Sequence, residues 1–307
     1  MRASWLGLFA LAVCTGCGNG ANAPADAGRI DAAIGDAATR AEPVDAGRSD
    51  AATEAGADAA AQGPLVFVLA GESNSGGIAR DSDATATELA PRPSVQILDL
   101  HSGTFAFEPL DIGFNNIVDH AGISTEPVYV PNPPTGSVVH GMELGLANAV
   151  ETGAFPAPVY LIKTGQGGSR IGQWAAGTPY WQKFVERTSA AKAKLPGSPR
   201  WVVWYSQGIN DALAGMPASE WKTDTTRHLA RIKAQLPGCQ IILTEFQSMQ
   251  SSGGYPAYNT AIRELVAADP TLASVATDGA ATLDPNHWSY AGFRDVVVPA
   301  LVAKTKR

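Results

Sequence analysis

The chain has 307 residues, of which 45% are hydrophobic and 17% charged, and it carries a formal net charge of −7 at pH 7. It contains no basic cluster and no stripe of basic and aromatic residues, which disfavours a nucleic-acid partner. The five histidines show no metal-ligand spacing with one another or with the three cysteines, so the sequence predicts no metal and no other cofactor.

The first seventeen residues predict export. Arg2 precedes an apolar run that ends at Val13, and small residues precede Cys17. The run of about nine apolar residues is shorter than the about 20 that a membrane-spanning helix needs. The small residues before Cys17 resemble a bacterial lipoprotein processing site; Cys14 is the weaker candidate because Val13 is bulky for a cleavage position. We therefore expect a signal peptide over residues 1–17 and an envelope lipoprotein that contacts the membrane only through a lipid on Cys17, with an ordinary cleaved signal as the alternative.

Residues 18–63 predict a disordered, Ala/Asp/Gly-rich linker. Eight acidic residues face three arginines there, and Ile30, Ile34 and Val44 are its only large aliphatic side chains. Such a segment cannot bury enough apolar surface to offset the entropy lost on ordering. The linker carries −5 of the chain's net charge of −7, so the part that follows is nearly neutral.

The remainder, residues 64–307, is long enough for one domain with a sizeable core. Runs rich in branched and aromatic residues predict strands at 65–69, 159–162, 201–205, 240–244 and 272–277. Apolar residues at helical spacing predict helices at 141–152, 180–195, 218–236 and 257–268. Strand then helix, repeated, predicts an α/β domain with a parallel sheet and helices on both faces. Cys239 has no cysteine partner in this domain and is expected to be a buried small hydrophobe.

Polar and glycine-rich segments follow the predicted strands at their carboxyl ends, where open α/β sheets bind ligands. The first strand leads to Ser73, the second to residues 164–169, and the third to residues 206–211. The last strand leads to Asp284 and His287. For any one of these segments an ordinary turn is the simpler interpretation, but together they indicate a site at one edge of the sheet.

The residue types at this edge predict a serine hydrolase. Ser73 is the candidate nucleophile, His287 the base that accepts its proton, and Asp284 the acid that holds the imidazole in the right tautomer. Asp278 is the rival for the acid, but only Asp284 lies three residues from His287. The predicted reaction passes through an acyl-enzyme that water hydrolyses.

The chain resembles the SGNH (GDSL-like) hydrolase superfamily in four blocks, which are Gly71-Glu72-Ser73-Asn74, Gly167-Gly168-Ser169, Gly208-Ile209-Asn210-Asp211 and Asp284-Pro285-Asn286-His287. It is most similar to the sialate O-acetylesterase and carbohydrate esterase family six (acetylxylan esterase) branch. That branch usually has glutamine where this chain has Glu72 and glutamate where it has Ile209. The resemblance implies a three-layer α/β/α sandwich with a parallel, flavodoxin-like sheet.

The resemblance also implies an oxyanion hole formed by the backbone N–H groups of Ser73 and Gly168, with Gly167 as the alternative, and by the Asn210 side-chain amide. We expect Glu72, Trp174 and Gln207 to bind substrate, and Trp181 and Trp288 are further candidates for a sugar platform. The expected substrate is an acetylated carbohydrate, of the acetylxylan or sialate type. A lipid or aryl esterase of the same superfamily and a non-catalytic glycan-binding lipoprotein are the alternatives.

Overall fold

The computed structural model describes residues 63–100, 104–111, 138–248, 250 and 254–305. The predicted signal peptide, the lipidation candidate Cys17 and all of the predicted linker except Gly63 lie outside these residues. Within the described ranges, no helix has both the length and the apolar character needed to cross a bilayer.

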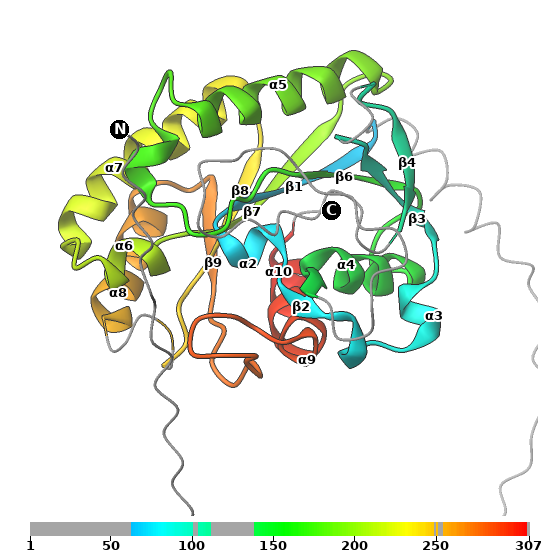
Figure 1. Cartoon of the computed structure of the whole chain (residues 1–307). Coiled ribbons are helices and arrows are strands. Elements are labelled where there is room, and N and C mark those ends of the chain that lie inside the picture. The colour runs from blue at the N-terminus through cyan, green and yellow to red at the C-terminus, as the bar shows by residue number, and fades with distance from the viewer. Residues whose placement is uncertain (1–62, 101–103, 112–137, 249, 251–253, 306–307) are drawn as a thin grey trace, which may run out of the picture. The chain divides into compact units, whose positions relative to one another are not determined.

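The main sheet in the described part has seven strands, which are β1 Leu65–Gly71, β3 Arg92–Leu98, β4 Phe107–Leu110, β6 Val159–Lys163, β7 Arg200–Ser206, β8 Gln240–Thr244 and β9 Leu272–Val275. They lie in the order β4-β3-β6-β1-β7-β8-β9 (Figure 1). β4 runs antiparallel to β3, and every other neighbouring pair is parallel. The prediction of an α/β domain with a parallel sheet is confirmed. Apart from β3 and β4, the strands follow the order 2-1-3-4-5 that flavodoxin-like sheets have.

The longer helices are α4 Met142–Glu151, α5 Pro179–Lys194, α7 Ala218–Gln235, α8 Tyr255–Ala268 and α10 Val298–Lys304. The short elements are α2 Ser73–Gly76, α3 Ala86–Leu89, α6 Ile209–Leu213, α9 Tyr290–Gly292, the 3₁₀ turns η1 Asp81–Asp83 and η2 Ile171–Trp174, and the π-helical turn η4 Phe293–Val297. A small antiparallel pair joins β2 Ala79–Arg80 to β5 Val138–His140.

The central strand β1 shows why helices cover both faces of the sheet. Its successive side chains point to opposite faces, and every residue of the strand is buried. Val66 and Val68 belong to a hydrophobic cluster with side chains of α5, α7 and α8. Leu65 and Phe67 belong to a second cluster with side chains of α4 and α10. Figure 1 shows α5 and α7 on one side of the sheet and α4 and α10 on the other.

The edge pair β3 and β4 is absent from the sequence-based prediction. Burial along β3 is interrupted between Arg92 and Val95, where Pro93 and Ser94 are not buried, so the strand has no continuous apolar run. β4 contains Pro109 and is only four residues long. β3 takes its place from pairing with β6, and β4 takes its place from pairing with β3; local sequence does not encode either pairing.

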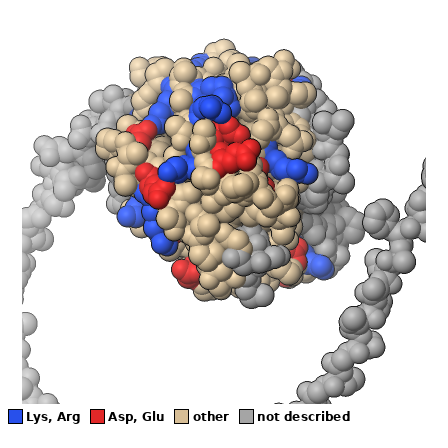
Figure 2. Space-filling model, turned by 90° about the vertical axis from the view of Figure 1, so that its left-hand side faces the viewer, with Lys and Arg blue, Asp and Glu red and all other residues tan. Residues whose placement is uncertain are grey.

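One face of the domain carries charges of both signs. Figure 2 shows blue and red side chains interspersed on the side of α7 and α8. Several of these charges are paired: Lys222 contacts Glu264 between α7 and α8 at 2.6 Å, and Lys233 contacts Asp269. Such surface pairs contribute about 0–1 kcal/mol each to the free energy of unfolding, so they add little to stability.

Candidate active site

Ser73 stands at the carboxyl end of β1, as the strand order predicts. Gly71 adopts a φ of 123°, and a Cβ there would lie 1.9 Å from the Ser206 carbonyl oxygen. Only glycine allows the ends of β1 and β7 to approach so closely. The Glu72 N–H then donates to the same Ser206 oxygen at 2.8 Å, and Ser73 begins the short helix α2. The tight β1–β7 pairing therefore fixes the backbone that carries the nucleophile.

The structure brings Ser73, His287 and Asp284 into one hydrogen-bonded chain. His287 Nε2 lies 3.0 Å from Ser73 Oγ. His287 Nδ1 lies 2.7 Å from Asp284 Oδ2. These are the two contacts that a serine nucleophile and its base require. Asp278, the rival acid, is exposed, and the ring contact is made by Asp284.

Asp284 also organises the loop that carries His287. Its Oδ1 accepts the backbone N–H groups of Asn286 at 2.8 Å and of His287 at 3.0 Å. Partial burial acts to raise the pKa of the Asp284 carboxyl, but the hydrogen bonds from His287 and Asn286 outweigh it and hold the pKa below its ordinary value. Asp284 is therefore a carboxylate at neutral pH, as the orienting acid must be.

Asn74 joins the nucleophile to the histidine loop. It is fully buried. Its Nδ2 donates to the Asn286 carbonyl at 3.1 Å, and its Oδ1 accepts the Trp288 N–H at 3.2 Å. The residue after the nucleophile thus binds the backbone on both sides of His287. Sequence reasoning gave Asn74 no such role; its adjacency to Ser73 was the only available signal.

Glu72 lies on the other side of the nucleophile and is also fully buried. Its Oε1 accepts the Ile209 N–H at 2.6 Å, and its Oε2 accepts the Asn210 N–H at 3.1 Å and a hydrogen bond from Asn210 Nδ2. Burial raises the pKa of the Glu72 carboxyl to about 7 even though these hydrogen bonds act to lower it. The two departures from the branch pattern, at positions 72 and 209, therefore meet in space.

Asp211 connects the second and third blocks in the same way. Both of its carboxylate oxygens accept the Ile171 N–H at 3.1 Å, and Gln207 Nε2 donates to Oδ2. Burial raises the pKa of Asp211, while these hydrogen bonds act to lower it. This contact fixes the start of η2, three residues after Gly168. Glu72 and Asp211 thus connect the segments of the first, second and third blocks through buried hydrogen bonds.

The predicted oxyanion donors lie on the segments that these carboxylates hold. No hydrogen bond within the described part of the chain uses the backbone N–H of Ser73, Gly167 or Gly168. Gly168 is partly exposed and adopts a φ of 71°, a conformation that favours glycine. Asn210 is half-buried, and its amide is oriented by Glu72. The backbone N–H groups of Ser73, Gly167 and Gly168 and the second amide hydrogen of Asn210 are therefore donors without a partner among the described residues.

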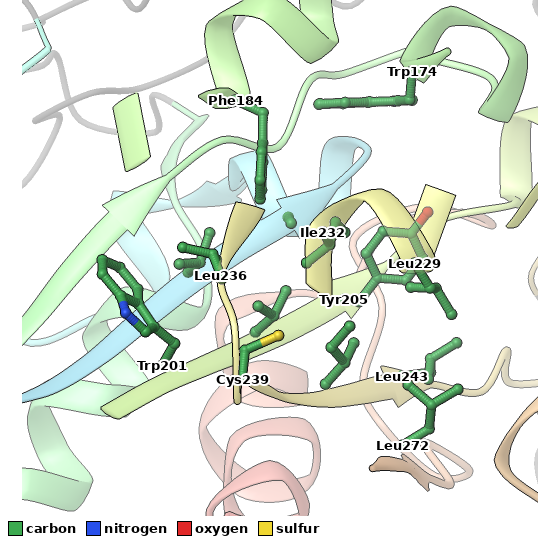
Figure 3. Close-up of a cluster of buried hydrophobic side chains, with 14 of the residues drawn as sticks. Trp174, Phe184, Trp201, Tyr205, Leu229, Ile232, Leu236, Cys239, Leu243 and Leu272 are labelled. Carbon is green, nitrogen blue, oxygen red and sulfur yellow. The ribbon is translucent and has the colours of Figure 1, made fainter. Parts of the chain in front are cut away.

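The prediction that Glu72, Trp174 and Gln207 bind substrate is wrong, because all three side chains are buried among other residues. Trp174 is 2% exposed and donates from Nε1 to Ser169 Oγ at 3.1 Å. Figure 3 shows its ring in the hydrophobic cluster that also contains Phe184 and Leu229. Gln207 is 2% exposed and links Asp211 to Trp221.

Of the other two candidates for a sugar platform, Trp288 is excluded by its burial, whereas Trp181 is half-buried and its role stays a prediction. Trp288 is 1% exposed and packs edge-on against Phe293. Trp181 stacks on Phe184 in α5. The sequence does not distinguish a buried tryptophan from an exposed one, because either can stand after the same kind of polar loop.

Two further predictions concern cysteine and metal. Cys239 is buried, as predicted, and burial raises the pKa of its thiol to about 11. Within the described ranges, no three His, Cys, Asp or Glu side chains are grouped so as to hold a metal ion.

Comparison with known proteins places this geometry in a family. A family model described as carbohydrate esterase, sialic acid-specific acetylesterase, matches residues 64–296. A probable carbohydrate esterase from Arabidopsis thaliana is 28% identical over 207 residues, which is 62% of this chain and 70% of that protein.

Two solved structures share the fold. An X-ray structure of an Arabidopsis thaliana protein superimposes with a TM-score of 0.59 at 18% identity, over 79% of this chain and 99% of the other. The crystal structure of NanS superimposes with a TM-score of 0.56 at 18% identity, over 79% of this chain and 96% of the other. At these identities the likeness concerns the fold.

Proposed function

The chain belongs to the carbohydrate esterase family of sialic acid-specific acetylesterases, and we propose that it removes O-acetyl groups from a carbohydrate through an acyl-enzyme on Ser73. The observation that carries the proposal is the continuous chain from Ser73 Oγ to His287 Nε2 at 3.0 Å and from His287 Nδ1 to Asp284 at 2.7 Å. It supplies a nucleophile, a base and an orienting acid in one arrangement.

The reaction follows from the roles of these groups. Ser73 Oγ attacks the acetyl carbonyl carbon while His287 Nε2 takes the hydroxyl proton, and Asp284 stabilises the imidazolium. The tetrahedral intermediate collapses, His287 returns the proton to the sugar oxygen, and the free sugar alcohol leaves. Water then attacks the acetyl-Ser73 ester by the same route and releases acetate.

The oxyanion of both intermediates needs donors that are already in position. The backbone N–H groups of Ser73 and Gly168 and the second amide hydrogen of Asn210 support this role, since they lie on the three segments that Glu72 and Asp211 tie together. Removing one such donor from an oxyanion hole costs about 10²- to 10³-fold in kcat.

Covalent labelling with a fluorophosphonate tests the catalytic part of the proposal. We expect the folded protein to be labelled and Ser73→Ala to remain unlabelled, with Ser75→Ala as the matched control because Ser75 Oγ donates to the Ala70 carbonyl at 2.6 Å instead of facing a base. A folded wild-type protein that resists labelling would favour the glycan-binding alternative.

Acetate release tests the substrate class. We expect release from acetylated sialic acid or acetylated xylan and weak hydrolysis of long-chain acyl esters. The family favours the sialate over the xylan. Equal or greater turnover of long acyl chains would support the lipid or aryl esterase instead.

We also propose export and a lipid anchor on Cys17, on the sequence of residues 1–17 alone. Expression in a Gram-negative host with a radioactive fatty acid should label the wild-type protein but not Cys17→Ser. Label that persists in Cys17→Ser and disappears in Cys14→Ser would move the anchor to Cys14. If the wild-type protein is not labelled either, residues 1–17 are an ordinary cleaved signal peptide without a lipid anchor.

A further inference from the structure

Glu72 is the acidic residue that precedes the nucleophile in the chain, and its side chain is buried. It is fully buried, and the three hydrogen bonds to its side chain all come from the third block: the Ile209 N–H, the Asn210 N–H and Asn210 Nδ2. None of its contacts involves Ser73 Oγ or His287. Glu72 therefore contacts neither the proton path nor solvent. Both of its carboxylate oxygens accept hydrogen bonds from Ile209 and Asn210, in the block that carries the proposed oxyanion donor.

The orientation of the Asn210 amide depends on the charge of its neighbour. A carboxylate only accepts hydrogen bonds, so it binds the NH₂ side of Asn210 and repels the carbonyl side. One amide hydrogen is used by Glu72, and the second stays available. A side chain with only one acceptor oxygen lacks this selectivity, because its other polar atom donates.

We propose that Glu72 is a positioning residue that locks the Asn210 side chain, through a three-donor carboxylate contact, in the orientation that presents its free amide hydrogen to the oxyanion. The inference rests on the proposed role of Asn210 in the oxyanion hole. It assigns to the residue before the nucleophile a function that is separate from nucleophile, base and substrate contact.

Glutamine is a demanding test of this role because it has almost the same size. In Glu72→Gln one oxygen becomes an NH₂ group, which must face either the Ile209 N–H or the two donors of Asn210. Either placement opposes donor to donor. An NH₂ group that faces the Ile209 N–H pushes away the backbone that carries Asn210, and one that faces Asn210 favours a turned-over Asn210 amide. Since misplacement of a catalytic group by about 1 Å can cost about 10²-fold, we expect kcat to fall between about 10-fold and 100-fold with KM little changed.

A double-mutant cycle separates positioning from general damage. Asn210→Ala alone should lower kcat by about 10²- to 10³-fold. In the Asn210→Ala background, Glu72→Gln should cause no further loss, because Glu72 acts only through Asn210. Effects that multiply, or a Glu72→Gln enzyme with wild-type kcat, would overturn the inference. The matched control is Glu245→Gln, a buried carboxylate that binds Arg263 and Ser274 instead of the oxyanion segment; its kcat should be unchanged.

A readout that does not need turnover distinguishes failure of this inference from failure of the proposed function. The ¹⁵N–¹H side-chain signals of Asn210, assigned by their loss in Asn210→Ala, should shift in Glu72→Gln and stay in place in Glu245→Gln. If the enzyme is active and its Asn210 signals do not shift in Glu72→Gln, the positioning role of Glu72 is wrong and the proposed esterase function stands. If the Asn210 signals shift in Glu72→Gln but the protein has no esterase activity, the contact between Glu72 and Asn210 is confirmed and the proposed function is wrong.

Discussion

Two carboxylates of the site, Asp284 beside the catalytic histidine and Glu72 next to the nucleophile in the chain, lie in opposite environments. The Asp284 side chain is 42% exposed, on a loop, and its hydrogen bonds hold its pKa below the ordinary value. Glu72 is fully buried under the site, and burial raises its pKa to about 7. Both accept three hydrogen bonds.

The difference shows that hydrogen bonding alone does not set the charge state of a site carboxylate. At Asp284 the hydrogen bonds together outweigh the loss of hydration, so its donors keep it ionised. At Glu72 the loss of hydration exceeds the gain from the same number of donors. Asp284 is therefore a constant charge over the neutral range, whereas the charge on Glu72 changes within it.

The largest expected effect comes from neutralising the exposed carboxylate. Asp284→Asn should lower kcat by about 10⁴-fold, because the amide no longer selects the His287 tautomer that accepts the Ser73 proton. Steady-state acetate release measures it. Asp278→Asn, on an exposed neighbouring acid, is the control and should leave kcat unchanged. A similar loss of kcat in both variants would mean that the 2.7 Å contact between Asp284 and His287 is not the cause of the loss.

The second prediction concerns stability and has opposite signs at the two carboxylates. The folded pKa of Glu72 is raised from 4.5 to about 7, so its proton stabilises the fold fully below pH 4.5, and this stabilisation is lost as the pH rises through about 7. The unfolding free energy of the wild type, measured relative to Glu72→Gln, should fall by about 3 kcal/mol from pH 4 to pH 8.

Asp284 should behave in the reverse sense. Its folded pKa is lowered, so its stabilisation is present above the ordinary value of 3.8 and is lost as the pH falls through the folded value. Chemical denaturation at a series of pH values, on wild type, Glu72→Gln and Asp284→Asn, gives both difference curves. Difference curves that slope in the same direction would refute the contrast between the two environments.

The third prediction tests the connection between the two regions. Asn74→Ala removes both hydrogen bonds to the backbone around His287, at 3.1 Å and 3.2 Å. The loop then loses its register with Ser73, and kcat should fall about 10- to 100-fold. Asn148→Ala is the control, since Asn148 binds Arg92 and Tyr290 away from the triad; it should lose stability without losing kcat. Equal kcat losses would point to general loosening.

The smallest expected effect is a change of slope in the pH profile. Below pH 7 Glu72 becomes protonated and can no longer accept all three hydrogen bonds. As the pH falls, wild-type kcat should therefore decrease more steeply than the kcat of Glu72→Gln, by up to about 10-fold per pH unit. The titratable groups that face Glu72 are Asp211, Tyr205 and Tyr258, and burial raises the pKa of all three. If the kcat–pH profiles of the wild type and Glu72→Gln are parallel below pH 7, protonation of Glu72 does not affect catalysis.

Particular residues show how far prediction from sequence reached. The five core strands and the four main helices were predicted within a few residues, because each carries its own apolar period. The strands β3 and β4 were missed because prolines interrupt them. Trp174 was assigned to substrate, although nothing local distinguishes an indole over a sugar from one packed on α5 and α7.

By itself, the sequence determined the α/β class, the place of Ser73, Asp284 and His287 at strand ends, and the pairing of an acid with a histidine three residues away. These features are local, since they depend on side-chain period and on neighbours within a few residues. The partners of Glu72 and Asn74 were decided only by the tertiary structure, because they lie 137 and 212 residues away along the chain. Burial decided the charge of Glu72 for the same reason: desolvation depends on everything packed around a group, and no local pattern records it.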